Sequence, residues 1–448
     1  MIRNTILIKN AHVVNEGIIT NCDVYIENGI FKEIAPQISV KSTDIEVYDA
    51  EGKYLLPGII DDQVHFREPG LTHKATIATE SKAAVAGGIT SFIEMPNTVP
   101  QTTTIAELDR KFEIAAQDSY ANYSFMFGGT NTNLEEILKV DPKKVAALKL
   151  FLGSSTGNML VDDPEVLEKI FSSTNLVIAV HCEDETTIRK NLAAYKEKFG
   201  EDIPIELHPV IRSEEACYLS SSQAVALAKK TGARLHVFHL STARELELFD
   251  NSIPLSEKKI TAEVCIHHLW FSKQDYKEKG TFIKWNPAVK SENDRESLFE
   301  ALLDDRLDVI ATDHAPHTLD EKQNVYTKAP SGGPLVQHAL PAMLEFYHQG
   351  KITLEKIVEK MCHNPAILFQ VEKRGYIKEG FKADAVLVDL NAPWTVTKDN
   401  IAYKCGWSPF EGNTFTSRIT HTFVNGALVY KNFKFYEVKN AEQLTFDR

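Results

Sequence analysis

The middle of the chain alternates short apolar runs with amphipathic stretches, and there are eight such apolar runs. Two of the amphipathic stretches are HKATIATESKAAVAGG and IAELDRKFEIAAQ. Strand-type runs that alternate with helices predict parallel strands, and eight such units predict an α/β chain folded as a closed (β/α)8 barrel. A doubly wound open sheet is the alternative fold. The apolar runs are YLLPGIIDDQVHF, ITSFIEMP, NYSFMFG, AALKLFL, LVIAVHCE, RLHVFHL, TAEVCIHHL and DVIATDHAP.

The two ends of the chain differ from its middle. Residues 1–55 and 372–448 contain short alternating runs that are separated by turns, including Asn28-Gly29 and Asn425-Gly426. Asn-Gly between alternating apolar residues is a strong hairpin signal. We therefore expect a small β-sandwich domain that is built from both ends, with the barrel occupying residues 56–371.

Charge and cysteine usage narrow the classes of partner. The chain has 49 Lys and Arg against 62 Asp and Glu, which gives a formal net charge of −13. This balance argues against nucleic acid or an anionic membrane surface as the main partner. The first residues lack a signal-peptide layout, and no apolar run reaches the roughly 18 residues that span a bilayer. The six cysteines form no CxxC pair, which favours reduced thiols and a cytoplasmic protein.

Most of the apolar runs carry a polar group at or near their end. In a (β/α)8 barrel the carboxyl ends of the strands converge on one mouth, where active sites lie. One histidine at a strand end is usually structural, but this many metal-binding and polar groups predict a site. His236, three residues before His239, is expected to face the opposite side of its strand. The residues are Gln63, His65, Arg67, Asn97, Lys149, His181, His239, His267, His268, Asp313 and His317.

These groups are of the kind that a divalent metal such as zinc accepts. Zinc binds histidine nitrogen and carboxylate oxygen, and it lowers the pKa of bound water towards about 7. Lys149 lies inside the apolar run AALKLFL, where burial would lower its pKa. A neutral amine can react with CO2 to give a carbamate, whose two oxygens can bridge two metals. A lysine that reaches out of the strand end or pairs with a carboxylate is the alternative.

The order of these residues resembles the amidohydrolase superfamily and, within its cyclic amidohydrolases, the dihydroorotases. PGIIDDQVHFREPG is similar to the family opening D-x-H-x-H-x-R-[ED]-P-G. The resemblance covers nearly the whole chain and includes both β-rich ends. The later blocks that are similar to the family are EMPNT, ALKLFLGSST, AVHCED, VFHLSTA, EVCIHHL and ATDHAPHT.

The resemblance implies a zinc centre with one or two ions per chain. His65 and Asp313 would bind the first metal, and His181 and His239 would hold the second. Lys149, carbamylated, would bridge the two. Asp313 would also serve as the general acid and base, which makes it the catalytic residue.

The resemblance also implies a small-molecule substrate, dihydroorotate or N-carbamoyl-aspartate. The reaction is the reversible hydrolysis of the cyclic amide of dihydroorotate, which in cells runs towards ring closure in pyrimidine synthesis. The planar fork of Arg67 would grip the substrate carboxylate with help from Asn97. Asn286 and His317 would complete the substrate site. Family habit implies a homo-oligomer, with a dimer as the expected form.

The first histidine of the family pair is replaced by Gln63. A neutral amide oxygen is a poor zinc ligand beside imidazole, so we expect the first metal site to be the weaker one. Because of Gln63, a second hypothesis stays open: the protein could be a non-catalytic, dihydroorotase-like subunit that scaffolds a partner enzyme. The other alternative is a dihydropyrimidinase (hydantoinase) or an allantoinase, whose substrates lack the ring carboxylate that Arg67 would bind.

The stretch from 318 to 334, TLDEKQNVYTKAPSGGP, is polar and rich in glycine and proline. It follows directly on His317. Such a loop beside an active site can be a mobile lid. A plain surface loop is the alternative, and the sequence leaves both open.

Overall fold

Eight strands of the middle region form the centre of the molecule. The structure is a computed structural model that describes residues 5–40, 45–153 and 159–448. Residues 154–156, which end the block ALKLFLGSST, lie outside the described residues. The strands are β6 (Ile59–Val64), β7 (Ile89–Glu94), β8 (Asn122–Phe125), β10 (Ala147–Phe151), β11 (Val177–His181), β12 (Leu235–Val237), β13 (Ile260–Cys265) and β14 (Val309–Ala311).

These strands close into a ring. Successive strands pair in parallel, and the short β9 (Phe127–Gly128) continues β8 and pairs with β10. The last strand returns to the first, because Val64 bridges His314 and the backbone N–H of His65 donates to the carbonyl of His314 at 2.7 Å. An open sheet would instead leave two unpaired edges. The predicted (β/α)8 barrel is therefore confirmed.

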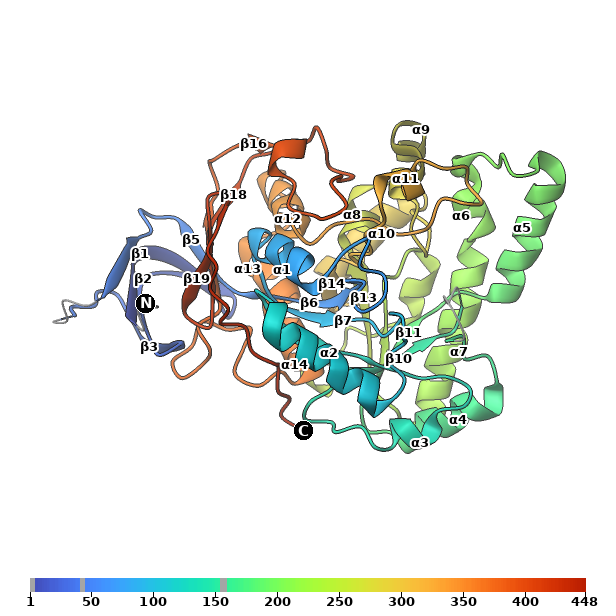
Figure 1. The fold of residues 1–448 in the computed structure, drawn as a ribbon, viewed down its shortest axis with the longest axis horizontal. Helices are drawn as coiled ribbons and strands as arrows, with labels where there is room; N and C mark the ends of the chain where they lie inside the picture. The colour runs from blue at the N-terminus through green and yellow to red at the C-terminus, as the bar shows by residue number, and fades with distance from the viewer. Residues whose placement is uncertain (1–4, 41–44, 154–158) are drawn as a thin grey trace.

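Helices surround the ring (Figure 1). The amphipathic stretches HKATIATESKAAVAGG and IAELDRKFEIAAQ form the helices α1 and α2. Helix α1 begins after Thr76, whose hydroxyl accepts a hydrogen bond from the backbone of Thr79 at 3.2 Å. The helices are α1 (Ile77–Ala86), α2 (Ile105–Asp118), α3 (Leu134–Ile137), α4 (Pro164–Ser173), α5 (Glu185–Phe199), α6 (His208–Ile211), α7 (Glu214–Thr231), α8 (Ile266–Trp270), α9 (Tyr276–Lys279), α10 (Glu292–Leu303), α11 (Leu319–Lys322), α12 (Ala339–His348), α13 (Leu354–Val358) and α14 (Asn364–Phe369).

The two chain ends share one nine-stranded sheet, which we call the terminal sheet. Its order is β20-β19-β18-β15-β5-β1-β2-β3, with β4 also pairing with β1. The ends meet where β5 pairs antiparallel with β15. The terminal sheet has a core of its own that includes Ile8, Val24, Phe31 and Phe423, none of which is exposed. The barrel is thus joined to a β unit made from both ends, as predicted, while the exact boundaries at 55/56 and 371/372 stay a prediction.

The strands of the terminal sheet come from two separate parts of the chain. They are β1 (Thr5–Asn15), β2 (Ile18–Glu27), β3 (Ile30–Ala35), β4 (Glu46–Asp49), β5 (Tyr54–Pro57), β15 (Ala385–Asp389), β18 (Arg418–Val424), β19 (Ala427–Lys431) and β20 (Lys434–Phe435). A separate pair, β16 (Trp394–Thr395) and β17 (Thr414–Phe415), lies between β15 and β18 in the chain.

The last residues of the chain leave the terminal sheet and return to the barrel. The backbone N–H of Leu444 donates to the carbonyl of Tyr123 in β8 at 2.8 Å. Leu444 and Phe446 are buried in a cluster that also contains Ile60 of β6 and Phe238, which follows β12. Figure 1 accordingly shows the C-terminus at the lower edge of the view, below α14.

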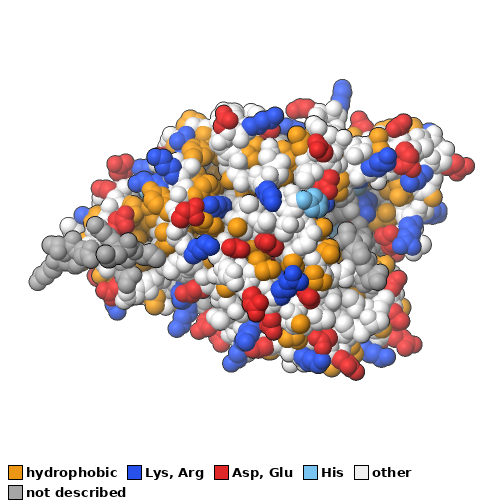
Figure 2. Space-filling model, viewed as in Figure 1, with side chains coloured by type: hydrophobic (Ala, Val, Ile, Leu, Met, Phe, Trp, Pro, Cys, Tyr) orange, Lys and Arg blue, Asp and Glu red, His pale blue; other side chains and the backbone are white. Residues whose placement is uncertain are grey.

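The surface carries charges of both signs, and the cysteines are free thiols, as the sequence indicated. Acidic and basic side chains are mixed over the face in Figure 2, and apolar side chains gather over the terminal sheet. All six thiols are free, as predicted, and five of them are buried. Within the described ranges, no helix has the length and apolar character that a membrane crossing requires.

We predict that Leu444→Ala lowers the free energy of unfolding by about 2–5 kcal/mol, because it opens a cavity against the barrel. Urea denaturation followed by circular dichroism measures the change. Tyr436→Ala is the control, since Tyr436 is 38% exposed and its loss should cost within about 0.5 kcal/mol. Equal midpoints for the two variants would show that the returning tail contributes no packing energy.

Candidate active site

The carboxyl ends of the barrel strands surround a cavity of about 430 Å³. Parallel strands bring these ends to the same face of the molecule. The nine residues to which the resemblance gave a role all line the cavity, whereas His267 and His268, which also follow a strand, are not among its lining residues. The nine are His65, Arg67, Asn97, Lys149, His181, His239, Asn286, Asp313 and His317.

His65, Asn97 and Asp313 form one connected group that follows the neighbouring strands β6, β7 and β14. His65 Nδ1 lies 2.8 Å from Asn97 Oδ1, and His65 Nε2 lies 3.2 Å from Asp313 Oδ1. Burial, with a further contribution from Arg67, holds the pKa of His65 well below its usual value. Burial raises the pKa of Asp313 to about 7. A neutral imidazole thus lies beside a carboxyl group that can both accept and release a proton near neutral pH.

His181 and His239 form a second group across the cavity. His181 Nδ1 lies 3.0 Å from His239 Nε2, while His181 Nε2 lies 2.9 Å from Glu183 Oε2. Arg212 pairs with the same carboxylate. Burial alone would raise the pKa of Glu183, but Arg212 and His181 bring it down to about 2, so the carboxylate is charged and orients the His181 ring. His239 Nδ1 is buried and, among the described residues, has no hydrogen-bond partner.

Three cavity residues have left-handed backbone. The φ angle is 68° at Arg67, 40° at His239 and 48° at Asp313. Residues other than glycine rarely adopt positive φ, and such conformations cluster at functional sites where the surrounding fold enforces them. Each of the three follows shortly after a barrel strand. The backbone turn aims their side chains into the cavity rather than along the strand.

Lys149 is almost fully buried in the middle of β10. Its Nζ lies 4.0 Å from the ring centre of Phe238 and 4.8 Å from that of Phe151. Burial lowers its pKa to about 7, although Glu263 and Asp313 oppose the change. A large fraction of the amine is therefore uncharged at neutral pH and can act as a nucleophile.

Arg67 and His317 lie together on another wall of the cavity. Arg67 Nε donates to the carbonyl of Pro316 at 3.1 Å, and Arg67 Nη2 lies 3.1 Å from His317 Nε2. Lys74 Nζ donates to His317 Nδ1 at 3.0 Å. Burial lowers the pKa of Arg67 only to about 10, so the guanidinium stays charged. This wall can receive an anion.

The loop from 318 to 334 packs over the same wall and contains α11. Lys322 is buried inside it, and its Nζ donates to the carbonyls of Pro330 at 2.9 Å and Gly332 at 2.7 Å. Trp407, from the segment between β15 and β18, donates from Nε1 to the carbonyl of His317 at 2.8 Å. Pro330 and Gly332 line the cavity, so the loop forms part of it. Movement of the loop as a lid stays a prediction.

Asn286 is tied to this loop by Ser331. The Ser331 hydroxyl donates to Asn286 Oδ1 at 2.9 Å, and both residues line the cavity. The contact fixes the direction in which the Asn286 amide faces the cavity.

Gln63 lies in the same cavity at the end of β6 and is almost fully buried. Its amide oxygen is 3.5 Å from the thiol sulfur of Cys265, from which it accepts a hydrogen bond. Thr312, beside Asp313, lies 3.4 Å from the Gln63 carbonyl. The Gln63 side chain is therefore already hydrogen-bonded to Cys265 of β13.

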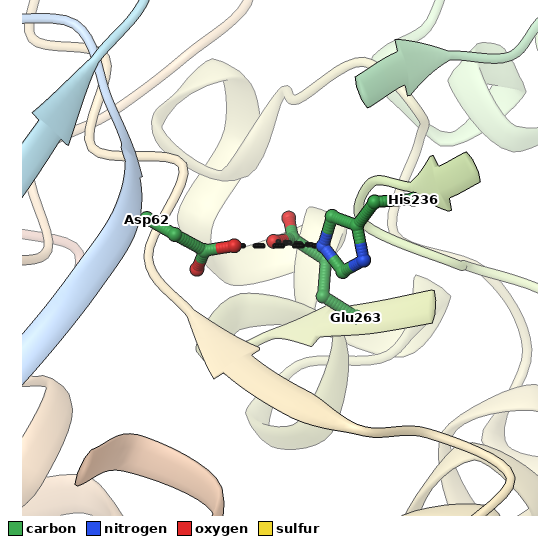
Figure 3. Close-up of side chains that lie close together, drawn as sticks. All are labelled: Asp62, His236 and Glu263. Carbon is green, nitrogen blue, oxygen red and sulfur yellow. Dashed lines mark hydrogen bonds and ion pairs between the residues drawn. The ribbon is translucent and has the colours of Figure 1, made fainter. Parts of the chain in front are cut away.

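Sequence reasoning missed several polar residues next to the cavity. Glu183 lies only two residues after His181, and that spacing could have revealed it. Asp62, His236 and Glu263 form a buried group of three polar side chains inside the barrel (Figure 3). An acidic residue within the apolar run TAEVCI was a signal of this group. Glu263 also reaches the cavity, because its Oε1 accepts from the backbone N–H of His239 at 3.1 Å.

Curated relatives of this chain carry the name dihydroorotase. The protein from Halobacterium salinarum is 37% identical over 368 residues, which are 82% of this chain and 84% of that protein. The protein from Carboxydothermus hydrogenoformans is 34% identical over 95% of this chain and 98% of its own length. The protein from Methanosphaera stadtmanae is 30% identical and matches 97% of this chain and 98% of its own.

Similar solved structures carry the names hydantoinase and dihydropyrimidinase. The L-hydantoinase from Arthrobacter aurescens superposes with a TM-score of 0.93 at 27% identity, over 99% of this chain and 100% of that one. The dihydropyrimidinase from Brevibacillus agri superposes with a TM-score of 0.87 at 25% identity, over the same shares of the two chains. The family model described as the amidohydrolase family matches residues 54–429. The chain, with its barrel and its histidine-lined cavity, belongs to the amidohydrolase family.

Proposed function

We propose that the protein is a dihydroorotase, which reversibly hydrolyses the cyclic amide of dihydroorotate to N-carbamoyl-aspartate. The observation that carries this proposal is the pairing of Arg67 and His317 in the same cavity as the histidine, lysine and aspartate groups. Dihydroorotate combines a ring amide with a carboxylate, so its enzyme needs both a hydrolytic centre and an anion-binding wall. The name shared by the curated relatives supports the same substrate.

The residues around the hydrolytic centre fit zinc. Metal ligands must be deprotonated, and burial lowers the pKa values of His65, His181 and His239. The unpartnered Nδ1 of His239 supports the fit, since a buried nitrogen needs a partner. We propose that these histidines, with Lys149 and Asp313, hold one or two zinc ions. When bound, zinc would polarise the ring carbonyl and lower the pKa of water towards about 7.

Lys149 is proposed to be carbamylated. A pKa of about 7 leaves the amine free to react with CO2 at neutral pH, whereas an ordinary lysine is protonated. The rings of Phe151 and Phe238 flank Lys149 Nζ and contribute to its burial. The carbamate carries a negative charge, which would balance part of the charge of the bound metal.

Asp313 is proposed to move the proton. The carboxyl group would accept a proton from the attacking water and release it to the leaving ring nitrogen. Both steps need a pKa near the working pH, and burial raises the pKa of Asp313 to about 7. Asp313 Oδ1 lies 3.2 Å from His65 Nε2, so the carboxyl group already faces the cavity.

Arg67 is proposed to bind the substrate carboxylate with its charged fork. The Pro316 carbonyl holds Arg67 Nε, which fixes the direction of the guanidinium before substrate arrives. Asn97 is proposed to donate from its amide NH2, because its Oδ1 is already engaged by His65. Asn286 and His317 would contact the rest of the ring.

A hydantoinase or dihydropyrimidinase is the second candidate function, because the similar solved structures carry those names. Their substrates have no ring carboxylate, so such an activity would leave the charge of Arg67 unused. A non-catalytic scaffold is less well supported. The nine residues predicted for catalysis and binding still share one cavity, and Gln63 is the single departure at the metal centre.

The same proposal places the reaction in pyrimidine biosynthesis, where ring closure is the physiological direction. The setting that we propose is the cytoplasm, with the enzyme working as a homo-oligomer, a dimer in the simplest case. Size-exclusion chromatography with light scattering measures the assembly state directly.

We expect the purified enzyme with zinc to hydrolyse dihydroorotate and to leave dihydrouracil, hydantoin and allantoin unchanged. Each hydrolysis is monitored by the loss of absorbance of the ring amide. The reverse direction is tested by the formation of dihydroorotate from N-carbamoyl-aspartate. Turnover of only the carboxylate-free rings would identify a hydantoinase or an allantoinase. Inactivity towards all four, together with a carbamoyltransferase that co-purifies, would identify a scaffold.

We expect Arg67→Gln to reduce kcat/KM for dihydroorotate by roughly 10- to 100-fold, mainly through a higher KM. The reason is the loss of a charged hydrogen bond, which contributes about 1.5–3 kcal/mol. Steady-state kinetics separates KM from kcat. Arg189→Gln, a change of the same kind on the outer face of α5, is the control and should leave both constants unchanged. An unaltered KM in Arg67→Gln would exclude a role in binding the carboxylate.

We expect Gln63→His to strengthen the metal position beside His65 and Asp313. Imidazole is a better zinc ligand than an amide oxygen. Zinc anomalous difference maps of both proteins should show a weak peak at this position in the unaltered protein and a strong one in Gln63→His. Peaks of equal height at the two active-site positions of the unaltered protein would contradict the weaker first site.

A further inference from the structure

Asp62, His236 and Glu263 form a closed group, which we call the floor group, from strands β6, β12 and β13. None of the three has any exposed surface. His236 Nε2 lies 3.3 Å from Glu263 Oε2 and 3.5 Å from Asp62 Oδ2 (Figure 3). The other ring nitrogen of His236 lies 2.9 Å from the hydroxyl of Thr261. One imidazole nitrogen therefore faces two carboxylates inside the barrel.

The charge of the floor group needs a cation. Two carboxylates that are cut off from water would leave two buried negative charges, and a buried charge without compensation is strongly destabilising. Two protons, one on His236 and one on a carboxylate, would balance them. One divalent cation bound by a neutral His236 would balance them equally well.

The distances in the floor group also fit a divalent cation. An N–H···O hydrogen bond is usually about 2.9–3.0 Å long, whereas His236 Nε2 makes one long hydrogen bond to Glu263 at 3.3 Å and an ion pair with Asp62 at 3.5 Å. Two ligands at about 2.1 Å from a tetrahedral zinc ion lie about 3.4 Å apart. The two separations in the floor group match that spacing. One ligand atom from each of the three residues lies within 4.8 Å of the other two.

Asp62 supplies an independent observation. Its carboxylate has no exposed surface, and among the described residues neither of its oxygens accepts a hydrogen bond. Buried polar atoms without partners are rare and mark a missing ion or water. Its Oδ2 points at His236 Nε2, as Figure 3 shows. The Asp62 carboxylate is thus aimed at the point between the three side chains. Its Oδ2 has the ion pair with His236, and its Oδ1 has no hydrogen-bond partner among the described residues.

The attraction of the group for positive charge agrees with this interpretation. Burial alone would lower the pKa of His236, but Asp62 and Glu263 raise it to about 9. The two carboxylates therefore favour a positive charge on the His236 ring.

We propose that Asp62, His236 and Glu263 bind a divalent cation of the zinc type, separate from the catalytic centre. Asp62 Oδ2, His236 Nε2 and Glu263 Oε2 are its protein ligands. The ion ties together three strands from different parts of the barrel, and it is taken up as the chain folds because the closed site has no exposed ligand atom. It also steadies the catalytic side of the barrel, since the other oxygen of Glu263 holds the backbone of His239.

Metal analysis with Zn²⁺ as the probe tests the proposal. The full-length protein is produced in zinc-supplemented medium, and zinc per chain is measured by mass spectrometry. Asp62→Asn and Asp62→Leu should each contain one zinc equivalent less than the unaltered protein. Asp61→Asn is the matched control, because Asp61 is the adjacent buried carboxylate but bonds to Thr312 instead. This control should retain the full zinc content.

A zinc anomalous map of the unaltered protein locates the ion and does not depend on whether a variant folds. The expected result is a peak at about 2 Å from the three ligand atoms. In His239→Asn this peak should persist while the peak beside His181 weakens. Absence of a peak in the floor group at saturating zinc overturns the proposal and leaves two protons as the balancing charge. Equal zinc in Asp62→Asn and the unaltered protein also overturns it.

Dihydroorotate turnover, measured on the same samples, keeps the two proposals apart. Turnover without an anomalous peak in the floor group refutes only the cation proposed for the floor group. A peak in the floor group without turnover refutes only the dihydroorotase function.

Discussion

The common direction of the eight barrel strands is the constraint on which the rest of the structure depends. Parallel strands in a closed ring present all of their carboxyl ends at one mouth, however far apart they lie in the chain. His65 and Asp313 therefore come within hydrogen-bonding distance although 247 residues (313 − 65 − 1) separate them in the chain. Because the walls exclude water, burial is the largest influence on the pKa values of the groups gathered there.

The sequence predicted the architecture and most of the named cavity residues, while Asn286 came from the resemblance alone. Apolar runs that alternate with amphipathic stretches leave few folds open, and residues at the ends of parallel strands must converge. The local contacts were not predictable. The pairing of His181 with Glu183 and of Asn97 with His65 depends on side-chain rotamers, which hydrophobic periodicity does not encode. The left-handed backbone at His239 and Asp313 is likewise imposed by the packing around them.

Side chains on a strand alternate between its two faces, and this alternation explains one correct prediction and one omission among the residues of the floor group. His236 was expected to face away from His239, and its ring indeed lies apart from the His181–His239 pair. It does not leave the barrel interior, because β12 ends at Val237 and His239 already belongs to the turn that follows. Asp62 escaped notice because the pairing register of β6 is irregular between Asp61 and Val64, so simple alternation does not describe that strand.

The hydrogen bond from Trp407 to the carbonyl of His317 has a consequence for how the enzyme is made. When residues 1–371 have emerged from the ribosome, all eight strands of the barrel have been synthesised. The mouth is still unfinished at that moment, because Trp407 and the segment around it follow later in the chain. Tyr403, whose phenol oxygen accepts a hydrogen bond from the backbone N–H of Gln337, belongs to the same segment between β15 and β18. During synthesis, the contact between Trp407 and His317 can therefore form only after all eight barrel strands have left the ribosome.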